Sequence, residues 1–157
     1  MKIALGNDHV GLGLVKELDD YFKIKKINIE HFGTFKTERM NYPEIAFSVS
    51  EAVASKEYDQ GILVCGTGLG MSLAANQIKG IRAVVCNDPY SAKMARSHNN
   101  SNIICFGSRI IGIEMAKMIL DNWNDYRPRF LKVMPTEYRR ALEEIKTEKL
   151  NSIVAAE

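Results

Sequence analysis

Five short hydrophobic runs alternate along the chain with longer amphipathic stretches, and this alternation restricts the fold more than any other feature. The runs are Ile3–Leu5, Ile27–Phe32, Gly61–Cys65, Ile81–Cys86 and Ile103–Phe106. Short runs of this kind are typical of strands that are buried on both faces. Strands that alternate with helices pair in parallel and carry helices on both faces of the sheet. The sequence therefore predicts a Rossmann-like, doubly wound α/β domain with a five-stranded parallel sheet.

Amphipathic stretches between the runs supply the predicted helices. Leu14, Leu18 and Phe22 recur at helical spacing in the first stretch. Asp88 followed by Pro89 marks the start of a later helix, because a carboxylate caps the first turn and proline is tolerated at the first helical position.

The last part of the chain differs from this pattern. We expect one domain over residues 1–125, followed by a C-terminal helical extension over residues 126–157. Pro128 and Pro135 bracket an irregular connector, and a final helix is predicted over residues 137–149. This extension is expected to pack on a neighbouring subunit.

Length, charge and cysteine use exclude several classes of protein. A chain of 157 residues with a net charge of +2 suits one globular domain and gives no support for binding to nucleic acid or an anionic membrane. No apolar stretch approaches the roughly 20 residues that span a bilayer, and the first residues lack the apolar core of a signal peptide. Cys65, Cys86 and Cys105 are widely spaced, which argues against a disulfide framework or a zinc site. We therefore expect a cytoplasmic protein.

A glycine loop directly follows the third hydrophobic run and reads C-G-T-G-L-G-M from residue 65. Alternating glycines let backbone N–H groups converge on an oxyanion, and the helix that follows adds its positive end. The same groups would stabilise a Cys65 thiolate. A reaction that passes through a carbanion needs a base beside donors for the developing negative oxygen. Cys65 with Gly66, Gly68 and Gly70 would supply both without a metal.

Other polar residues follow the predicted strands at the edge where ligands of open parallel sheets collect. The residues after the first, third and fifth runs include Asp8, His9, Cys65 and Arg109. His98 and Asn99 instead lie between the fourth helix and the fifth strand, at the opposite edge of the sheet. A site that combines His98 with Cys65 therefore needs a second copy of the chain.

Two other interpretations remain open at this point. Each residue has an ordinary structural explanation, such as a helix cap for Asp8 or core packing for Cys65. A dinucleotide site is suggested by the glycine loop and by Asp88, about twenty residues further on. Against it, Met71 stands where that fingerprint has its last glycine. A protein that binds a phosphorylated ligand without chemistry is the other possibility.

Six segments in fixed order carry a resemblance to a known family. They read G-N-D-H-V-G, T-E-R-M-N-Y-P, G-I-L-V-C-G-T-G-L-G-M-S-L-A-A-N, G-I-R-A-V-V, Y-S-A-K-M-A-R-S-H-N-N and G-S-R-I-I-G, over roughly residues 2–123. Together they resemble the ribose-5-phosphate isomerase B family, which includes the subunits of galactose-6-phosphate isomerase. The resemblance implies an aldose–ketose isomerase that works through an enediolate, without cofactor or metal. Ribose 5-phosphate to ribulose 5-phosphate is the leading reaction, and a tetrose or hexose phosphate is the alternative.

The resemblance also implies a role for each matching residue. Cys65 matches the base that moves the proton, Thr67 lies beside the enediolate, and His98 opens the furanose ring. The implied substrate-binding residues are Asp8, His9, Gly66, Gly68, Leu69, Gly70, Asn99 and Arg109. His9 and Arg109 match the phosphate side of the site. The resemblance further implies a homodimer or homotetramer whose site lies between two subunits.

One segment departs from the family pattern. After Trp123, family members usually carry G-G-R-H-x-x-R, whose arginines bind phosphate, whereas this chain reads Y-R-P-R-F-L-K-V-M-P-T-E-Y-R-R. The basic residues available there are Arg127, Arg129, Lys132, Arg139 and Arg140. We expect Arg127 and Arg129, held by Pro128 between them, to reach the phosphate by a different path.

Overall fold

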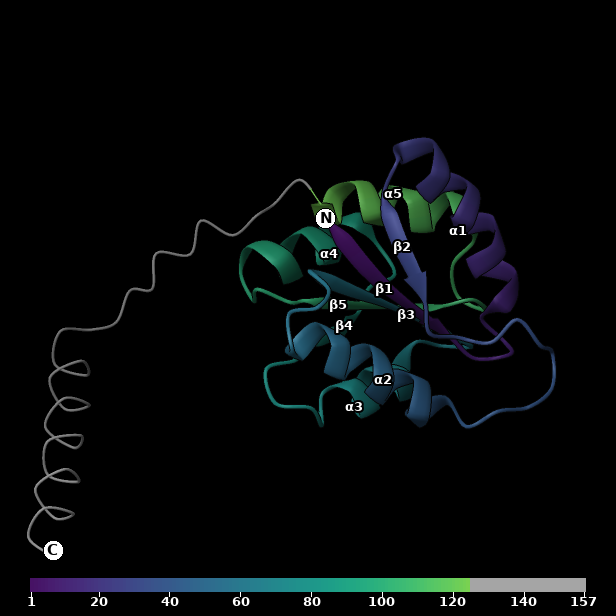
Figure 1. Cartoon of the computed structure of the whole chain (residues 1–157). Helices are drawn as coiled ribbons and strands as arrows, with labels where there is room; N and C mark the ends of the chain where they lie inside the picture. Colours follow the sequence, from purple (N-terminus) through teal and green to yellow (C-terminus); the bar gives the residue numbers. More distant parts are fainter. Residues whose placement is uncertain (125–157) are drawn as a thin grey trace, which may run out of the picture.

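The computed structural model describes residues 1–124, which form a five-stranded parallel sheet with helices on both faces (Figure 1). The strands are β1 (Lys2–Asn7), β2 (Asn28–His31), β3 (Gln60–Cys65), β4 (Ala83–Val85) and β5 (Ile103–Gly107). The helices are α1 (Leu12–Lys25), α2 (Tyr42–Ala54), α3 (Leu69–Ala75), α4 (Pro89–Ser97) and α5 (Ile113–Asn124). The predicted doubly wound α/β fold is confirmed. The predicted connector, the final helix and the five basic residues after Trp123 lie outside the described residues.

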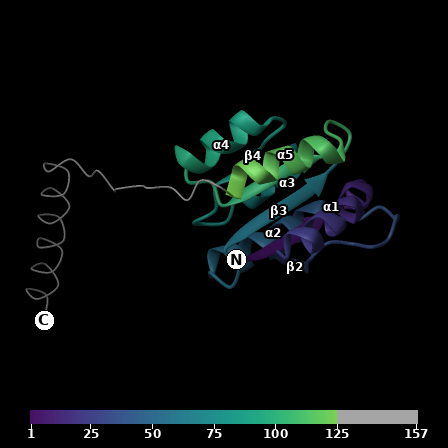
Figure 2. The same ribbon diagram turned by 90° about the horizontal axis from the view of Figure 1, so that it is seen from above.

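Two helical layers enclose the sheet. The layer of α1, α4 and α5 covers one face, and α2 and α3 cover the other (Figures 1 and 2). Side chains along β3 alternate between these layers, because successive residues of a strand point to opposite faces. Ile62 and Val64 pack with the first layer, whereas Leu63 and Cys65 pack with the second. The Cys65 thiol therefore lies on the α2–α3 side of the sheet.

The strand order is β2-β1-β3-β5-β4, so that β3 is central and β1 and β5 are its direct neighbours. Asn7 pairs with Val64, and Cys65 pairs with Gly107. The carboxyl ends of these three strands therefore lie side by side. The loops after β1, β3 and β5 meet at this edge.

The expectation that every strand is buried on both faces is wrong for β2. This strand lies at the edge of the sheet, and both Asn28 and Glu30 are exposed. The fourth strand is also shorter than the hydrophobic run that predicted it. Ile81 donates its N–H to Ile78 in a turn, at 3.1 Å, before β4 begins at Ala83.

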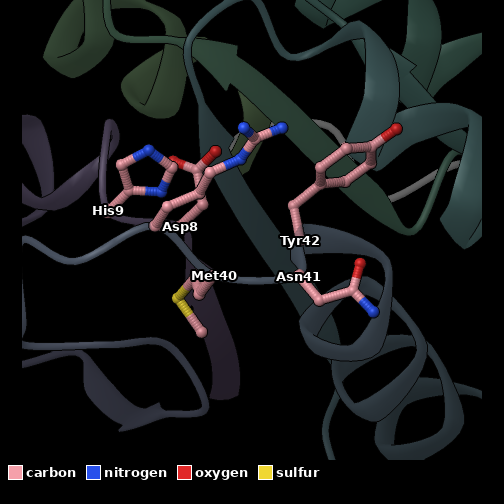
Figure 3. Close-up of a pocket in the computed structure, with 6 residues that line it drawn as sticks. Asp8, His9, Met40, Asn41 and Tyr42 are labelled. Carbon is pink, nitrogen blue, oxygen red and sulfur yellow. The ribbon is translucent and has the colours of Figure 1, made fainter.

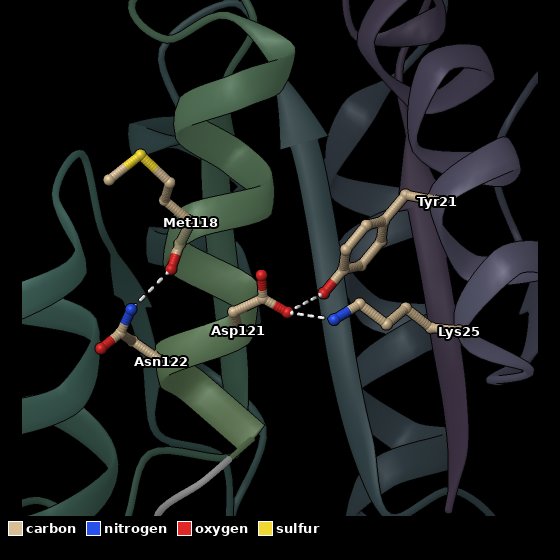
Figure 4. Close-up of polar contacts among 5 residues, drawn as sticks. All are labelled: Tyr21, Lys25, Met118, Asp121 and Asn122. Carbon is tan, nitrogen blue, oxygen red and sulfur yellow. Dashed lines mark hydrogen bonds and ion pairs between the residues drawn. The ribbon is translucent and has the colours of Figure 1, made fainter.

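A polar cluster joins α1 to α5 on one face of the sheet (Figure 4). Asp121 Oδ1 accepts hydrogen bonds from Tyr21 Oη at 2.8 Å and from Lys25 Nζ at 2.9 Å. Burial, and then the bond to Asp121, raise the pKa of Tyr21, while Lys25 lowers the pKa of Asp121. Further along α5, Asn122 Nδ2 donates to Met118 O at 2.9 Å. The contacts of Asp121 fix the C-terminal half of α5 against α1.

Candidate active site

Backbone hydrogen bonds hold the three loops of the carboxyl edge together. Asp8 donates its N–H to Val64 O at 3.1 Å, and Ser108 donates its N–H to Cys65 O at 2.8 Å. The Ser108 hydroxyl donates to the same Cys65 carbonyl at 3.1 Å. The end of β3 is thus fixed at Val64 from the β1 side and at Cys65 from the β5 side, and the residues predicted after β1, β3 and β5 do come together.

The two carboxylate oxygens of Asp8 have different environments. Its side chain is buried, with 6% exposed, and Oδ1 accepts the N–H groups of Val10 and Gly11, each at 2.9 Å. Among residues 1–124, no donor binds the second oxygen, Oδ2. The carboxylate is therefore held in place by one oxygen and offers the other to a ligand hydroxyl.

The Cys65 thiol lies at the entrance of the glycine loop. The Gly68 N–H points at Cys65 Sγ, with nitrogen and sulfur 3.1 Å apart. Gly68 has a φ of +78°, and a methyl group there would lie 3.2 Å from the Phe106 carbonyl carbon. Only glycine meets both conditions without strain. The glycine loop therefore directs a backbone N–H at the Cys65 sulfur.

The other two cysteines have a different environment. Burial raises the pKa of the Cys86 thiol to about 12, and Asp88 adds to the rise. Burial also raises the pKa of Cys105 well above its usual range, with smaller contributions from Cys65 and Cys86. Both thiols stay protonated at neutral pH. Of the three cysteines, only Cys65 ends a strand directly before the glycine loop.

The glycine loop offers further donors beside the thiol. In the part of the chain that the structure describes, the N–H groups of Gly66, Thr67 and Gly70 have no hydrogen-bond acceptor. Thr67 Oγ1 accepts the Leu69 N–H at 3.4 Å, and both side chains are exposed. These N–H groups are available to a negatively charged ligand oxygen.

A cavity of about 520 Å³ lies at the loop after β1 and the start of α2 (Figure 3). Its lining residues are Asp8, His9, Arg39, Met40, Asn41 and Tyr42. His9 Nδ1 is buried and has no partner within residues 1–124. The Tyr42 ring lies against Gly70, where an added methyl group would come within 2.8 Å of Cζ. Cys65 is not among the residues that line the cavity, and the contact between Tyr42 and Gly70 links the cavity to the glycine loop.

Four residues of the cavity were not among the predicted site residues: Arg39, Met40, Asn41 and Tyr42. All four belong to the segment that leads from β2 into α2, which starts at the carboxyl edge of the sheet. A residue count from the end of β2 could have placed this segment near Asp8. It contains no periodic pattern, so the sequence did not show which of its side chains line the cavity.

Arg109 lies beside the glycine loop, as expected. Its N–H donates to Gly66 O at 3.1 Å. A methyl group on Gly66 would lie 3.6 Å from Arg109 Nη1, so the guanidinium is close to the loop. The side chain is exposed and has no ion-pair partner among the described residues. Arg109 can therefore bind an anion that enters the loop.

His98 and Asn99 lie at the amino edge of the sheet, away from Cys65. His98 ends α4 and donates its N–H to Met94 O at 2.8 Å. The turn leads into β5 at Ile103, whereas Cys65 pairs with the last residue of that strand, Gly107. Both His98 and Asn99 are exposed. One chain therefore does not join His98 to Cys65, as the topology predicted.

Within residues 1–124, no cluster of three or more His, Cys, Asp or Glu side chains suits a metal ion. None of the helices in this range is long and apolar enough to cross a membrane.

Comparison with known proteins defines the class of this site. Residues 3–145 match the model of the family described as Ribose/Galactose Isomerase. Ribose-5-phosphate isomerase B of Escherichia coli K12 is 51% identical over 122 residues, which cover 78% of this chain and 82% of that protein. D-erythrulose-4-phosphate isomerase of Pectobacterium atrosepticum is 39% identical over 126 residues, covering 80% and 83%.

Solved structures agree with this result. The structure of Clostridium thermocellum ribose-5-phosphate isomerase B superposes with a TM-score of 0.80 at 39% identity, covering 96% of this chain and 99% of that one. The protein is a sugar-phosphate isomerase, an enzyme that interconverts aldoses and ketoses. The chain belongs to the ribose/galactose isomerase family. The resemblance carried by its six segments is confirmed.

Proposed function

We propose that the enzyme interconverts ribose 5-phosphate and ribulose 5-phosphate, with Cys65 as the base. The observation that carries this proposal is the Gly68 N–H held 3.1 Å from the Cys65 sulfur, at the entrance of a loop with unpaired N–H groups. The sugar is inferred from the relatives, because identity is higher to the ribose-5-phosphate isomerase B of E. coli, at 51%, than to the erythrulose-phosphate enzyme, at 39%.

The proton transfer follows from this arrangement. The Cys65 thiolate removes the proton from C2 of the open-chain aldose, and the electron pair moves through C1 to O1. The loop N–H groups of Gly66 and Gly70 donate to the oxyanion, beside the Thr67 hydroxyl. A proton then passes from O2 to O1, and the thiol returns its proton to C1. The ketose results, with no net gain or loss of atoms.

Residues of the cavity hold the rest of the sugar phosphate. Asp8 Oδ2 accepts a sugar hydroxyl, because Oδ1 is already occupied. His9 and Arg39 share the cavity and provide hydrogen-bond donors for the phosphate. Arg109 reaches the same ligand from the loop after β5. Arg39 adds a cation that the sequence analysis did not assign.

We propose that the active enzyme is a homodimer or a larger homo-oligomer. Aldopentose phosphates are mostly cyclic, so a general acid–base group must open the furanose ring before C2 loses its proton. His98 performs this step at the Cys65 of a second chain, and Asn99 binds a hydroxyl there. Subunit exchange between Cys65→Ala and His98→Asn enzymes should restore part of the activity. Mixed oligomers that form without any rescue would contradict the shared site.

The cytoplasm is the proposed location, because Cys65, Cys86 and Cys105 are all free thiols.

An isomerase assay without added cofactor tests the substrate. We expect the highest kcat/KM for ribose 5-phosphate, compared with D-erythrose 4-phosphate and galactose 6-phosphate. A higher value for the tetrose or hexose phosphate would contradict the proposed substrate within the same reaction class. The Cys65→Ala enzyme, measured on the same sugars, is the control and should lose kcat on all of them.

A further inference from the structure

A buried arginine lies on the far side of the molecule from the cavity. Arg96 is in the last turn of α4, only 9% exposed, and pairs with no carboxylate in residues 1–124. Its Cζ lies 5.5 Å from the centroid of the Trp123 ring. Trp123 is itself fixed, because its Nε1 donates to Gln60 Oε1 at 2.8 Å. A buried cation without a counter-ion costs free energy, so its presence calls for a physical reason.

The hydrogen bonds of Arg96 indicate that reason. Nη1 donates to the carbonyl oxygen of Ser101 and lies 3.5 Å from Asn100 Oδ1. Asn100 adopts a left-handed conformation, with φ of 50°, and the Ser101 N–H donates to Ala95 O at 3.0 Å. Arg96 therefore binds the strained part of the turn that follows α4 and fixes its path.

A second guanidinium binds the same turn from outside. Arg82 Nε donates to Asn100 O at 2.9 Å. Burial, followed by the charge of Arg82, lowers the pKa of Arg96, which agrees with two cations that lie close together. The carbonyls that they bind follow the C-terminal end of α4, where positive charge is favoured. Of the two, Arg82 is exposed and Arg96 is buried, so Arg96 holds the turn more rigidly.

The turn presents His98 and Asn99 to solvent, immediately before the residues that Arg96 binds. We propose that Arg96 is a positioning residue for the ring-opening step, and that it orients His98 through the turn without touching the sugar. This inference rests on the proposed function of His98. It explains why a cation stacked on Trp123 donates to the Ser101 carbonyl of the turn rather than to a carboxylate.

A double-mutant cycle on kcat for ribose 5-phosphate tests the proposal. Arg96→Met keeps most of the side-chain volume but removes the donors, and a misplaced His98 should then lower kcat by about tenfold to a hundredfold. The double variant with His98→Asn should be no slower than His98→Asn alone, because the two residues act as one unit. Losses that multiply in the double variant, or an unchanged kcat for Arg96→Met, would overturn the proposal.

Two further variants separate positioning from loss of the fold. Arg96→Lys keeps the charge and the aliphatic stem, and we expect its kcat to lie between the values of the wild type and Arg96→Met. In the His98→Asn background, Arg96→Lys should cause no further loss of kcat. If thermal unfolding shows that Arg96→Met is not folded, the double-mutant cycle is measured with Arg96→Lys instead. Asn100→Gly keeps the left-handed turn while removing only the longer contact, and it should retain most of kcat. A loss as large as that of Arg96→Met would overturn the assignment to the Ser101 carbonyl.

The kcat of His98→Asn distinguishes a failure of the proposed role of His98 from a failure of the inference about Arg96. A His98→Asn enzyme with normal kcat would remove the proposed role of His98, and the inference about Arg96 with it. If His98→Asn is slow and the double variant with Arg96→Met multiplies the two losses of kcat, only the inference about Arg96 would be overturned.

Discussion

Tyr42 lies against Gly70 so closely that a methyl group on Gly70 would be 2.8 Å from Cζ of the ring and 3.0 Å from its hydroxyl oxygen. Tyr42 begins α2, and Gly70 is the second residue of α3. The contact therefore joins two helix starts at the carboxyl edge of the sheet. Since Tyr42 also lines the cavity, this contact brings the cavity next to the loop that begins at Cys65.

The first prediction concerns this contact between Tyr42 and Gly70. Gly70→Ala should displace the exposed end of the Tyr42 side chain rather than unfold the protein, since that end can move. The cavity then changes shape, and we expect KM for the sugar phosphate to rise by roughly tenfold, which corresponds to about 1.4 kcal/mol of lost binding. Steady-state kinetics and thermal unfolding measure the two effects.

Gly13→Ala is the matched control, because a methyl group on Gly13 meets nothing within 4 Å. This variant should keep its activity and gain up to about 1 kcal/mol of stability from the helical alanine. An unchanged KM in Gly70→Ala would show that Tyr42 does not shape the substrate path.

The second prediction concerns the reactivity of the thiols. At about pH 8, iodoacetamide should modify Cys65 first, because only thiolates react and burial holds the other two thiols protonated. Deprotonation of Cys86 begins to matter only as pH approaches its raised pKa of about 12. Mass spectrometry should find one modified cysteine, in step with the loss of activity.

Two variants check this assignment. Cys86→Ala should be inactivated at the wild-type rate, and Cys65→Ala should resist modification. Fast labelling of Cys105 in the folded protein would contradict the protonation order that burial imposes.

The sequence predicted the sheet well because buried strands consist of continuous hydrophobic residues. The start of α4 was also predictable, since Asp88 Oδ1 accepts the Ser91 N–H at 2.8 Å just before Pro89. Patterns of this kind depend on neighbours in the chain. The edge position of β2 depends instead on which strands pair, and hydrophobicity alone does not contain that information.

The residues of the candidate site also differ in how well the sequence predicts their positions. Asp8, Cys65 and Arg109 follow directly from strand ends, so the sequence placed them correctly. The position of Arg39 and Tyr42 depends on a long segment that folds back over the edge of the sheet, which no local pattern encodes. The cation that lines the cavity was therefore found only in the structure.

The third prediction separates ring opening from proton transfer. D-erythrose 4-phosphate cannot form a furanose, because the oxygen that would close the ring carries the phosphate. His98→Asn should therefore lose much of its kcat on ribose 5-phosphate, about a hundredfold or more, and far less on the tetrose phosphate. The relative named D-erythrulose-4-phosphate isomerase makes a tetrose phosphate a reasonable probe for this fold.

Cys65→Ala provides the comparison, since loss of the base should affect both sugars equally. Equal fractional losses on the two sugars in His98→Asn would assign this residue to proton transfer or to structure instead.

The last prediction concerns Arg39 as a phosphate ligand. Arg39 lines the same cavity as His9, whose Nδ1 is buried without a partner among the described residues. A guanidinium binds a phosphate dianion with two parallel donors, so its removal affects binding of the phosphorylated end of the sugar. Arg39→Met should raise KM for ribose 5-phosphate by more than about tenfold, or about 1.4 kcal/mol, with kcat little changed.

Inhibition by inorganic phosphate should weaken in parallel, since the same contact binds the free anion. Lys16→Met removes an equal charge from the exposed side of α1, so it controls for the net charge of the protein. It should leave KM for ribose 5-phosphate and the inhibition constant of inorganic phosphate unchanged. If Arg39→Met keeps the wild-type KM and phosphate inhibition, the anchor lies elsewhere. The arginines at positions 127 and 129 are then the next candidates, because they provide the guanidinium groups closest after Trp123 in the chain.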